Sequence, residues 1–284
     1  MDYTPTPYII SHEAHFVCEI LYEHGFDTIG LLNSRLFDSF WKGFSDYHQK
    51  EVVSYFVPKE VLPLLDLDRI TTGNKEQQFF FRHVVGVPRD QTFLDKLYQV
   101  PFKDVPNKYF VLHLEFQTNG NLVFTIRMAD YMLLRNLTDK SITYSMAIVG
   151  HKEGEYSNKY MVGTTENGIV AKFEDHIIKD LPESTYQRKG CIVSHALHAV
   201  WIQEHKNQFT QKELQEKYYK ICQNVTSFDF DGTRYVSIIL FVLKYALDCI
   251  PDTETFSTFV RKVLNLTPKI SFMTIFEEIE ANGE

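Results

Sequence analysis

The chain has 284 residues, of which 44% are hydrophobic and 23% charged, and its net charge is −8. This composition indicates a folded protein and excludes an intrinsically disordered chain. The acidic balance argues against a protein that coats nucleic acid through a general basic excess, although a local basic cleft remains compatible with it.

The sequence gives no sign of a membrane span or a secretory leader. There is no run of 18 apolar residues, and the first residues lack a basic segment followed by an apolar core. The four cysteines are far apart and form no C-x-x-C pair: Cys18, Cys191, Cys222 and Cys249. We therefore expect reduced thiols in a cytoplasmic protein with no membrane partner.

Residues 1–60 are predicted to form helices that pack on a central domain. Apolar residues at helical spacing predict helices at 12–24 and 35–56, and Pro58 would end the second. Residues 61–65 are expected to be a connector, and residues 66–73 a loop.

Residues 61–181 are predicted to form a central α/β domain. Aromatic and β-branched runs predict strands at 77–87, 93–100, 109–117, 142–149, 160–163 and 169–178. Turn residues at 118–121 and a helix at 124–137 separate the third strand from the fourth. This order of elements fits a mixed sheet flanked by helices.

Residues 182–284 are predicted to form an all-helical region. The expected helices are 184–205, 211–224, 233–249, 253–264 and 271–281, with breaks at Asn207, Gly232, Pro251 and Pro268. This region could be a second domain or a lid on the first, and the sequence does not decide between them.

A group of polar residues stands out on two neighbouring strands. Alternation puts His113, Glu115 and Gln117 on one side of the strand 109–117, in an otherwise apolar run. If the loop 101–107 folds this strand back on the preceding one, Asp95 comes close to Glu115. Two carboxylates on adjacent strands make a plausible Mg²⁺ site.

These residues resemble a known nuclease superfamily. The pattern Asp95, Glu115 and Gln117 is similar to the PD-(D/E)xK core with Gln in place of the usual Lys. More closely, FLDKLYQV, KYFVLHLEFQT and FTIRMADYMLL resemble the recombination-promoting nuclease and transposase-like families of bacteria. In the helix motif R-M-x-x-Y, Arg127, Met128 and Tyr131 match. The resemblance covers about residues 37–150, and Asp38, Lys42 and Pro58 echo the motifs expected upstream.

The resemblance implies a restriction-endonuclease-like α/β fold and a metal-dependent DNA endonuclease. Asp95 and Glu115 would hold Mg²⁺ or Mn²⁺, with Glu76 as a further acid. Gln117 would position the attacking water, and Arg127 with Tyr131 would contact the phosphate. DNA would be the partner, bound by a monomer or a homo-oligomer.

Structural alternatives exist for each of these residues. The acids could be surface groups on a sheet edge, Glu76 a solvated loop charge, and Asp38 and Lys42 a salt bridge. Arg127 could pair with Glu115 or Asp130 instead of a phosphate. The histidine pairs His12/His15 and His195/His198 have metal-binding spacing, and Cys191 near His195 hints at a thiol nucleophile, but ordinary structural roles are favoured for them.

Two other classes of function stay open. The fold could serve as a nucleic-acid-binding module that has lost turnover, which the absence of the usual Lys permits. It could instead serve as a protein-interaction module, which the negative charge and the many aromatic residues favour. Nucleotide-binding and serine-hydrolase motifs are missing from the sequence.

Overall fold

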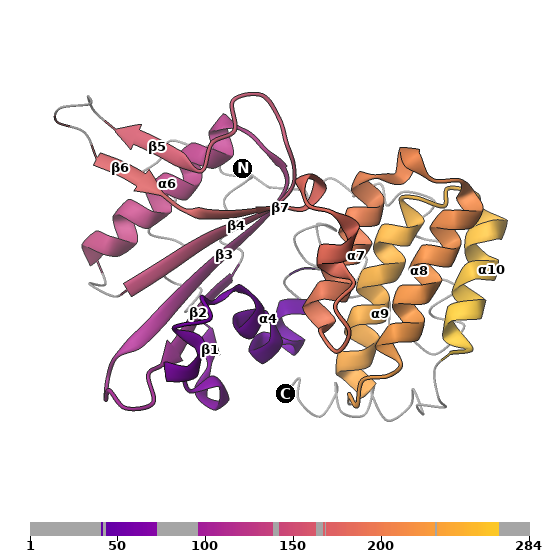
Figure 1. Ribbon diagram of the computed structural model, residues 1–284, viewed down its shortest axis with the longest axis horizontal. Helices are drawn as coiled ribbons and strands as arrows, with labels where there is room; N and C mark the ends of the chain where they lie inside the picture. The colour runs from indigo at the N-terminus through magenta and orange to yellow at the C-terminus, as the bar shows by residue number, and fades with distance from the viewer. Residues whose placement is uncertain are drawn as a thin grey trace, which may run out of the picture. The chain divides into compact units, whose positions relative to one another are not determined.

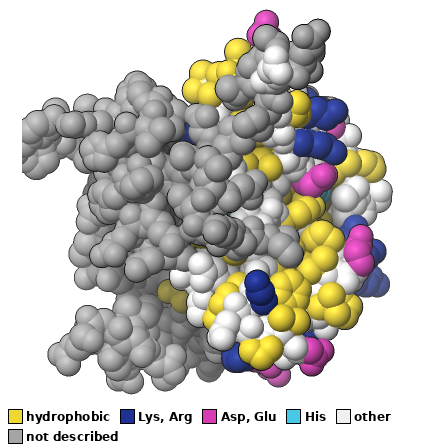
Figure 2. All heavy atoms as spheres, turned by 90° about the vertical axis from the view of Figure 1, so that its left-hand side faces the viewer, with side chains coloured by type: hydrophobic (Ala, Val, Ile, Leu, Met, Phe, Trp, Pro, Cys, Tyr) yellow, Lys and Arg dark blue, Asp and Glu magenta, His cyan; other side chains and the backbone are white. Residues whose placement is uncertain are grey.

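The computed structural model describes residues 41, 44–72, 96–138, 142–162, 167, 169–230 and 232–266. The predicted helices 12–24 and 271–281, the predicted strand 77–87, and residues Glu76 and Asp95 lie outside this described part. Within it, the chain forms two compact units, Trp41–His205 and the residues from Lys206 onward, each described here by itself (Figure 1). On the face drawn in Figure 2, exposed hydrophobic side chains of the described residues lie among Lys, Arg, Asp and Glu side chains.

The first unit is built on a five-stranded mixed sheet with the order β1-β2-β3-β4-β7. The strands are β1 (Thr71–Thr72), β2 (Lys96–Pro101), β3 (Tyr109–Gly120), β4 (Ile142–Lys152) and β7 (Glu174–Ile177). Neighbours β1, β2 and β3 pair antiparallel, whereas β3, β4 and β7 pair parallel. The prediction of an α/β protein with a mixed sheet is confirmed.

Strand β3 lies in the middle of the sheet and is buried on both faces. From Phe110 to Phe116 every residue is buried, which fits its nearly continuous apolar sequence. The chain leaves β3 through the helix α6 (Leu122–Thr138) and returns as β4, because two parallel strands need a crossover connection.

Helical segments cover the two faces of this sheet. On one face, Phe124 and Met128 of α6 pack against Ala147 and Val149 of β4 in a buried cluster with Phe173 and Ile177. On the other face, Trp41 stacks on Phe116 with ring centroids 4.4 Å apart, and the Tyr98 hydroxyl donates to the Ser45 carbonyl. Residues 44–47 and α4 (Gln49–Phe56) are helical, and the helix ends before Pro58 as predicted.

Several local predictions are wrong. Within the loop expected at 66–73, Thr71 and Thr72 form the short strand β1. The turn expected at 118–121 is absent, since β3 continues to Gly120 and the Asn121 side chain instead caps α6 by accepting from the Phe124 amide at 3.0 Å. The strand expected at 169–178 is split at Phe173, whose buried ring joins the cluster under α6. Its first half, β6 (Ile169–Lys172), pairs with β5 (Lys159–Val162) in a separate two-stranded sheet.

The helix expected at 184–205 also begins later than predicted. Gly190 has a φ of +72°, and the helix α7 starts two residues after it, at Ile192–Glu204. Because α7 packs against β4 and against the 3-10 turn η4 (Ile178–Asp180), the first unit runs past the predicted boundary at residue 182. Further 3-10 turns are η1 (Leu62–Leu64), η2 (Leu67–Arg69) and η5 (Glu183–Tyr186).

The second unit is all-helical, as predicted for this region. After η6 (Lys206–Gln208) it contains α8 (Gln211–Val225), α9 (Gly232–Leu247) and α10 (Thr253–Leu264).

Cys191, Cys222 and Cys249 are free thiols, and burial raises the pKa of Cys222 to about 12. In the part of the chain that the structure describes, no helix combines the length and the hydropathy that crossing a membrane requires.

Candidate functional site

The predicted row of polar residues is present on the α6 side of β3. Glu115 pairs in register with Ala147, and Gln117 with Val149, so both lie beside residues that α6 covers. His113 and Glu115 are buried, and Gln117 is half-buried. The alternation of the sequence thus predicted this row, but not that a helix would cover it.

Arg127 of α6 contacts both Glu115 and Gln117 through a single nitrogen. Its Nη2 lies 3.0 Å from Glu115 Oε1 and 3.0 Å from Gln117 Oε1. The Glu115 side chain is 1% exposed and that of Arg127 17%, so this is a mostly buried ion pair. Because the Gln117 carbonyl accepts from Arg127, its amide nitrogen is left to act as a donor.

The start of α6 is fixed in a way that places Arg127 over the strand. Phe124 and Met128 are one turn apart and anchor the helix in the core. Thr125 Oγ1 donates to the Ser157 carbonyl at 2.7 Å, which ties the first turn to the loop before β5. The guanidinium carbon also lies 5.2 Å from the centroid of the Phe124 ring.

His113 extends this polar group toward β4. Its Nδ1 lies 3.4 Å from Ser145 Oγ, and its Nε2 lies 3.6 Å from Glu115 Oε2. The Glu115 carboxylate is therefore flanked by a guanidinium on one oxygen and an imidazole near the other. Such contacts hold a carboxylate in one orientation.

The donor set around Arg127 Nη2 fits a cation that prefers oxygen ligands. A carboxylate oxygen and an amide oxygen converge on one point, which the guanidinium nitrogen fills. Mg²⁺ and Mn²⁺ take such hard oxygen ligands. Among the described residues no group of three or more His, Cys, Asp or Glu side chains could hold a metal ion, but the predicted ligands Asp95 and Glu76 lie outside this set.

The pairing of β2 with β3 bears on Asp95. At the end of the described β2–β3 ladder, Lys96 pairs with Leu114. The residue before Lys96 is Asp95 and the residue after Leu114 is Glu115. The antiparallel pairing that the prediction assumed for these two strands is thus present from Lys96 to Pro101, and Asp95 itself lies outside the described residues.

The remaining residues singled out in the sequence either lie outside the description or make other contacts. Tyr131 lies in α6, but its side chain, like that of Asp130, is outside the description, as are Asp38 and Lys42. His198 Nε2 lies 2.9 Å from Glu183 Oε1, and burial, with the nearby His198, lowers the pKa of His195 to about 4. These contacts support structural roles for the pair His195/His198.

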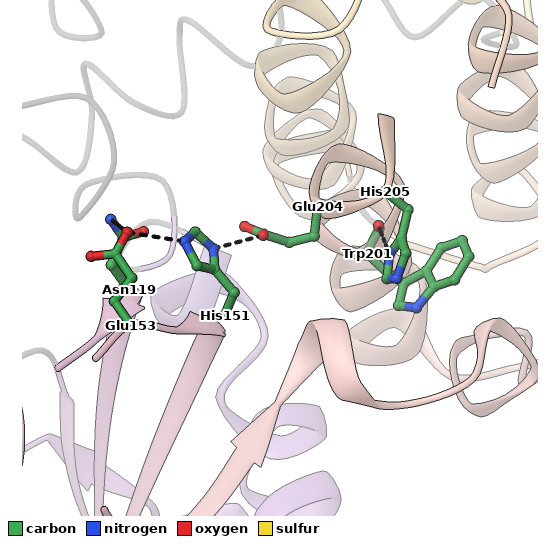
Figure 3. A network of polar contacts seen from close by, with 6 residues as sticks. All are labelled: Asn119, His151, Glu153, Trp201, Glu204 and His205. Carbon is green, nitrogen blue, oxygen red and sulfur yellow. Dashed lines mark hydrogen bonds and ion pairs between the residues drawn. The ribbon is translucent and has the colours of Figure 1, made fainter. Parts of the chain in front are cut away.

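Sequence reasoning missed a second polar group at the C-terminal ends of β3 and β4 (Figure 3). There, Asn119 and Glu153 contact each other, and His151 lies between the carboxylates of Glu153 and Glu204. The available signal was a histidine two residues after the end of the predicted strand 142–149, followed by an acid two residues later.

Comparison with known proteins adds no relative. No family model, no curated protein and no solved structure gives a significant match to this chain.

Proposed function

We propose that this protein is a metal-dependent DNA endonuclease of the PD-(D/E)xK type, which hydrolyses phosphodiester bonds with Mg²⁺ or Mn²⁺. The observation that carries the proposal is the convergence of Glu115 Oε1 and Gln117 Oε1 on one cationic nitrogen, 3.0 Å from each. A strand that aims two hard oxygens at a positive charge has the chemistry of a cation site.

The order of the elements supports the same proposal. An antiparallel pair, β2 and β3, is followed by the crossover helix α6 and the parallel strand β4. The nuclease resemblance puts its first acid on the strand before the Glu-x-Gln strand, and its Arg on the helix after it. Arg127 lies at the Glu115 and Gln117 side chains, and Met128 is in the core beneath α6.

Each side chain then has a chemical task. Glu115 and Asp95 would hold the metal, which when bound would offset the charge that builds on the phosphate. Gln117 would donate from its amide nitrogen to an oxygen of the water or the phosphate. Arg127, released from Glu115, would contact a non-bridging phosphate oxygen, for which its planar fork of donors is suited.

Cleavage of supercoiled plasmid tests this function. The wild type is expected to nick DNA with Mg²⁺ or Mn²⁺ and to stop when EDTA is added, whereas Glu115→Gln and Asp95→Asn abolish cutting with the fold intact by circular dichroism. Glu174→Gln removes an exposed carboxylate from β7 and is the matched control that should cut normally. Normal cutting by both site variants would contradict the assignment.

A catalytically silent nucleic-acid-binding module is the second candidate. Two observations favour it: Gln117 brings no positive charge where the superfamily has Lys, and Glu115 is already paired with Arg127. Fluorescence anisotropy with labelled duplex DNA distinguishes the two candidates. Binding that ignores EDTA, with no cutting under any metal, would select the silent module.

A further inference from the structure

The polar group at the ends of β3 and β4 presents two carboxylates to one imidazole. His151 Nδ1 lies 2.7 Å from Glu204 Oε2, and its Nε2 lies 3.3 Å from Glu153 Oε1 (Figure 3). Asn119, the partner of His151 in the parallel register, donates from Nδ2 to the same Glu153 oxygen at 2.9 Å. An imidazole, a carboxylate and an amide therefore meet on the Nε2 side of the ring, and Glu204 is on the other side.

The two carboxylates differ in their surroundings. The Glu204 side chain is 8% exposed, whereas that of Glu153 is 50% exposed and that of His151 26%. A neutral imidazole carries one proton, and the buried Glu204 carboxylate favours that proton on Nδ1. Nε2 then directs a lone pair at the Glu153 oxygen, and two acceptors cannot hydrogen-bond to each other. A cation between Nε2 and the Glu153 oxygen would remove this conflict.

The fold makes room for Glu204 beside the imidazole. A Cβ atom at Gly150 would lie 2.7 Å from Glu204 Oε1 and 2.6 Å from the Thr118 carbonyl oxygen, closer than real Cβ contacts come. Glu204 is also the last residue of α7, where the helix dipole disfavours a negative charge, and the contact with His151 offsets this placement. A carboxylate that accepts from one ring N–H is the usual companion of a histidine whose other nitrogen binds a metal.

The distances on the Nε2 side suit a small divalent ion. Zn²⁺ binds nitrogen and oxygen ligands at about 2.0 to 2.2 Å, so the ligands of a tetrahedral ion lie about 3.3 to 3.6 Å from one another. The 3.3 Å between His151 Nε2 and Glu153 Oε1 is already such a separation. Asn119 Oδ1 is buried and has no hydrogen-bond partner among the described residues. A half-turn of this amide would exchange Oδ1 with Nδ2 and bring an oxygen to the Glu153 carboxylate.

We propose that His151 Nε2, a Glu153 carboxylate oxygen and Asn119 Oδ1 bind a Zn²⁺ ion, and that Glu204 positions the His151 ring. Water would complete the coordination, because the Glu153 and His151 side chains both reach solvent. Among the described residues no three His, Cys, Asp or Glu side chains could hold a metal together. The proposed site agrees with this finding, since Glu204 meets the opposite ring nitrogen and the third donor is an amide.

This site is independent of the proposed nuclease function. It contains an imidazole nitrogen, which suits Zn²⁺, whereas Mg²⁺ takes oxygen ligands. Mn²⁺ is the weakest binder among the divalent ions of its row and should bind here far less tightly than Zn²⁺. Glu115→Gln, which removes a predicted ligand of the nuclease metal, should therefore leave Zn²⁺ binding unchanged.

Titration calorimetry of the metal-stripped full chain with Zn²⁺ tests the proposal. His151→Gln and Glu153→Gln should each abolish binding at this site. Glu204→Gln should weaken it by about 10- to 100-fold, because the ring loses its charged partner. Asn119→Asp should strengthen it by on the order of tenfold, because it replaces a neutral ligand with a charged one.

Two controls separate this site from other histidines. His205→Gln changes the residue after Glu204, whose Nδ1 bonds to the Trp201 carbonyl at 2.9 Å, and should bind Zn²⁺ like the wild type. The double variant His12→Gln with His15→Gln removes the pair with metal-binding spacing near the start of the chain. It should also keep the His151-dependent binding, and loss of all binding in this variant would contradict the proposal.

A spectroscopic measurement guards against variants that merely misfold. Nitrogen-15 spectra of the wild-type histidine rings should show His151 Nε2 shifting when Zn²⁺ is added, while Nδ1 keeps its proton. A wild type that binds no Zn²⁺, or folded His151→Gln and Glu153→Gln proteins that bind it as the wild type does, would overturn the inference. Either result would leave the nuclease function standing.

Discussion

Arg127 and Glu115 form an ion pair between α6 and β3, with Nη2 3.0 Å from Oε1 and the carboxylate 1% exposed. The Glu115 carboxylate is almost completely shielded from water, so its charge is stabilised in the fold by the Arg127 guanidinium. The pair is expected to stabilise the fold, and in the proposed function Arg127 Nη2 also occupies the point at which a metal would bind; experiment can separate these two roles.

Removal of one partner should be costly, and removal of both less so. Arg127→Met leaves the Glu115 charge buried and should lower the free energy of unfolding by about 3 kcal/mol. The double variant Glu115→Gln with Arg127→Met should lose less than the sum of the single losses, by about 1 kcal/mol or more. Urea unfolding of all four proteins measures this coupling. Additive losses would show that the pair contributes nothing.

The same variant should bind metal more tightly. Without the guanidinium, Glu115 no longer has to exchange one cation for another, so Arg127→Met should bind Mn²⁺ more tightly by on the order of tenfold. Titration calorimetry of the DNA-free protein measures this affinity. Glu115→Gln should abolish binding, and Lys172→Met, which removes an exposed cation on β6, should not change it. Weaker binding by Arg127→Met would contradict the exchange.

Two buried histidines should make the fold sensitive to acid. Burial, with a contribution from the Arg188 charge, lowers the pKa of His176 to about 4, and burial, with the nearby His198, lowers that of His195 to about 4. The unfolded chain takes up each proton near pH 6.5, which is well before the folded chain does. The free energy of unfolding should therefore fall between about pH 6.5 and 4, by on the order of 2 kcal/mol per histidine.

This pH dependence can be assigned to its residues. Urea unfolding at pH 7.5, 5.5 and 4.5 should show a shallower loss of stability in His176→Gln and in His195→Gln than in the wild type. If both variants follow the wild-type curve, other groups cause the loss.

Gly150 should tolerate a side chain less well than Gly154. A Cβ at Gly150 meets the Thr118 carbonyl oxygen at 2.6 Å, and Gly150→Ala should cost about 1 to 3 kcal/mol. Gly154 has a φ of +56° and nothing within 4 Å, so Gly154→Ala should cost only the backbone strain, about 1 kcal/mol. Thermal unfolding compares the two, and equal losses would show that β3 and α7 can move apart.

The helical unit should depend on its first cap. Thr210 and Glu213 form a capping box at the start of α8, with the Glu213 amide bonded to Thr210 Oγ1 at 3.3 Å. Thr210→Ala should cost about 1 kcal/mol, whereas Thr258→Ala on the exposed side of α10 should cost little. Thermal unfolding of both variants decides this, and an unchanged Thr210→Ala would show that water replaces the cap.

The sequence predicted correctly those helices and strands whose hydrophobic pattern repeats over several residues. Alternation over 109–117 located β3 and the side that Glu115 and Gln117 share, and helical spacing located α8 and α10. Prediction from the sequence failed where a single residue is suited to two different local structures. Asn121 is a good turn residue and also a good helix cap, and the structure uses it as a cap.

Contacts between distant residues were beyond the sequence for a different reason. His151 and Glu204 are 53 residues apart, and their meeting depends on α7 packing against the end of β4. Arg127 was predicted in the site from a resemblance, but its bond to Gln117 follows from how the core anchors α6. Neither fact is encoded in local spacing.

The placement of Arg127 on a helix, opposite a strand held in the middle of the sheet, has a consequence for how fast the site could change. β3 is hydrogen-bonded on both sides and cannot shift without breaking its ladders with β2 and β4. The Arg127 side chain needs only to rotate about its own bonds, a motion far quicker than the opening of a sheet. In the proposed function, exchange between the Arg127–Glu115 ion pair and a metal-bound site would therefore need only rotation of the Arg127 side chain, and the sheet would not have to move.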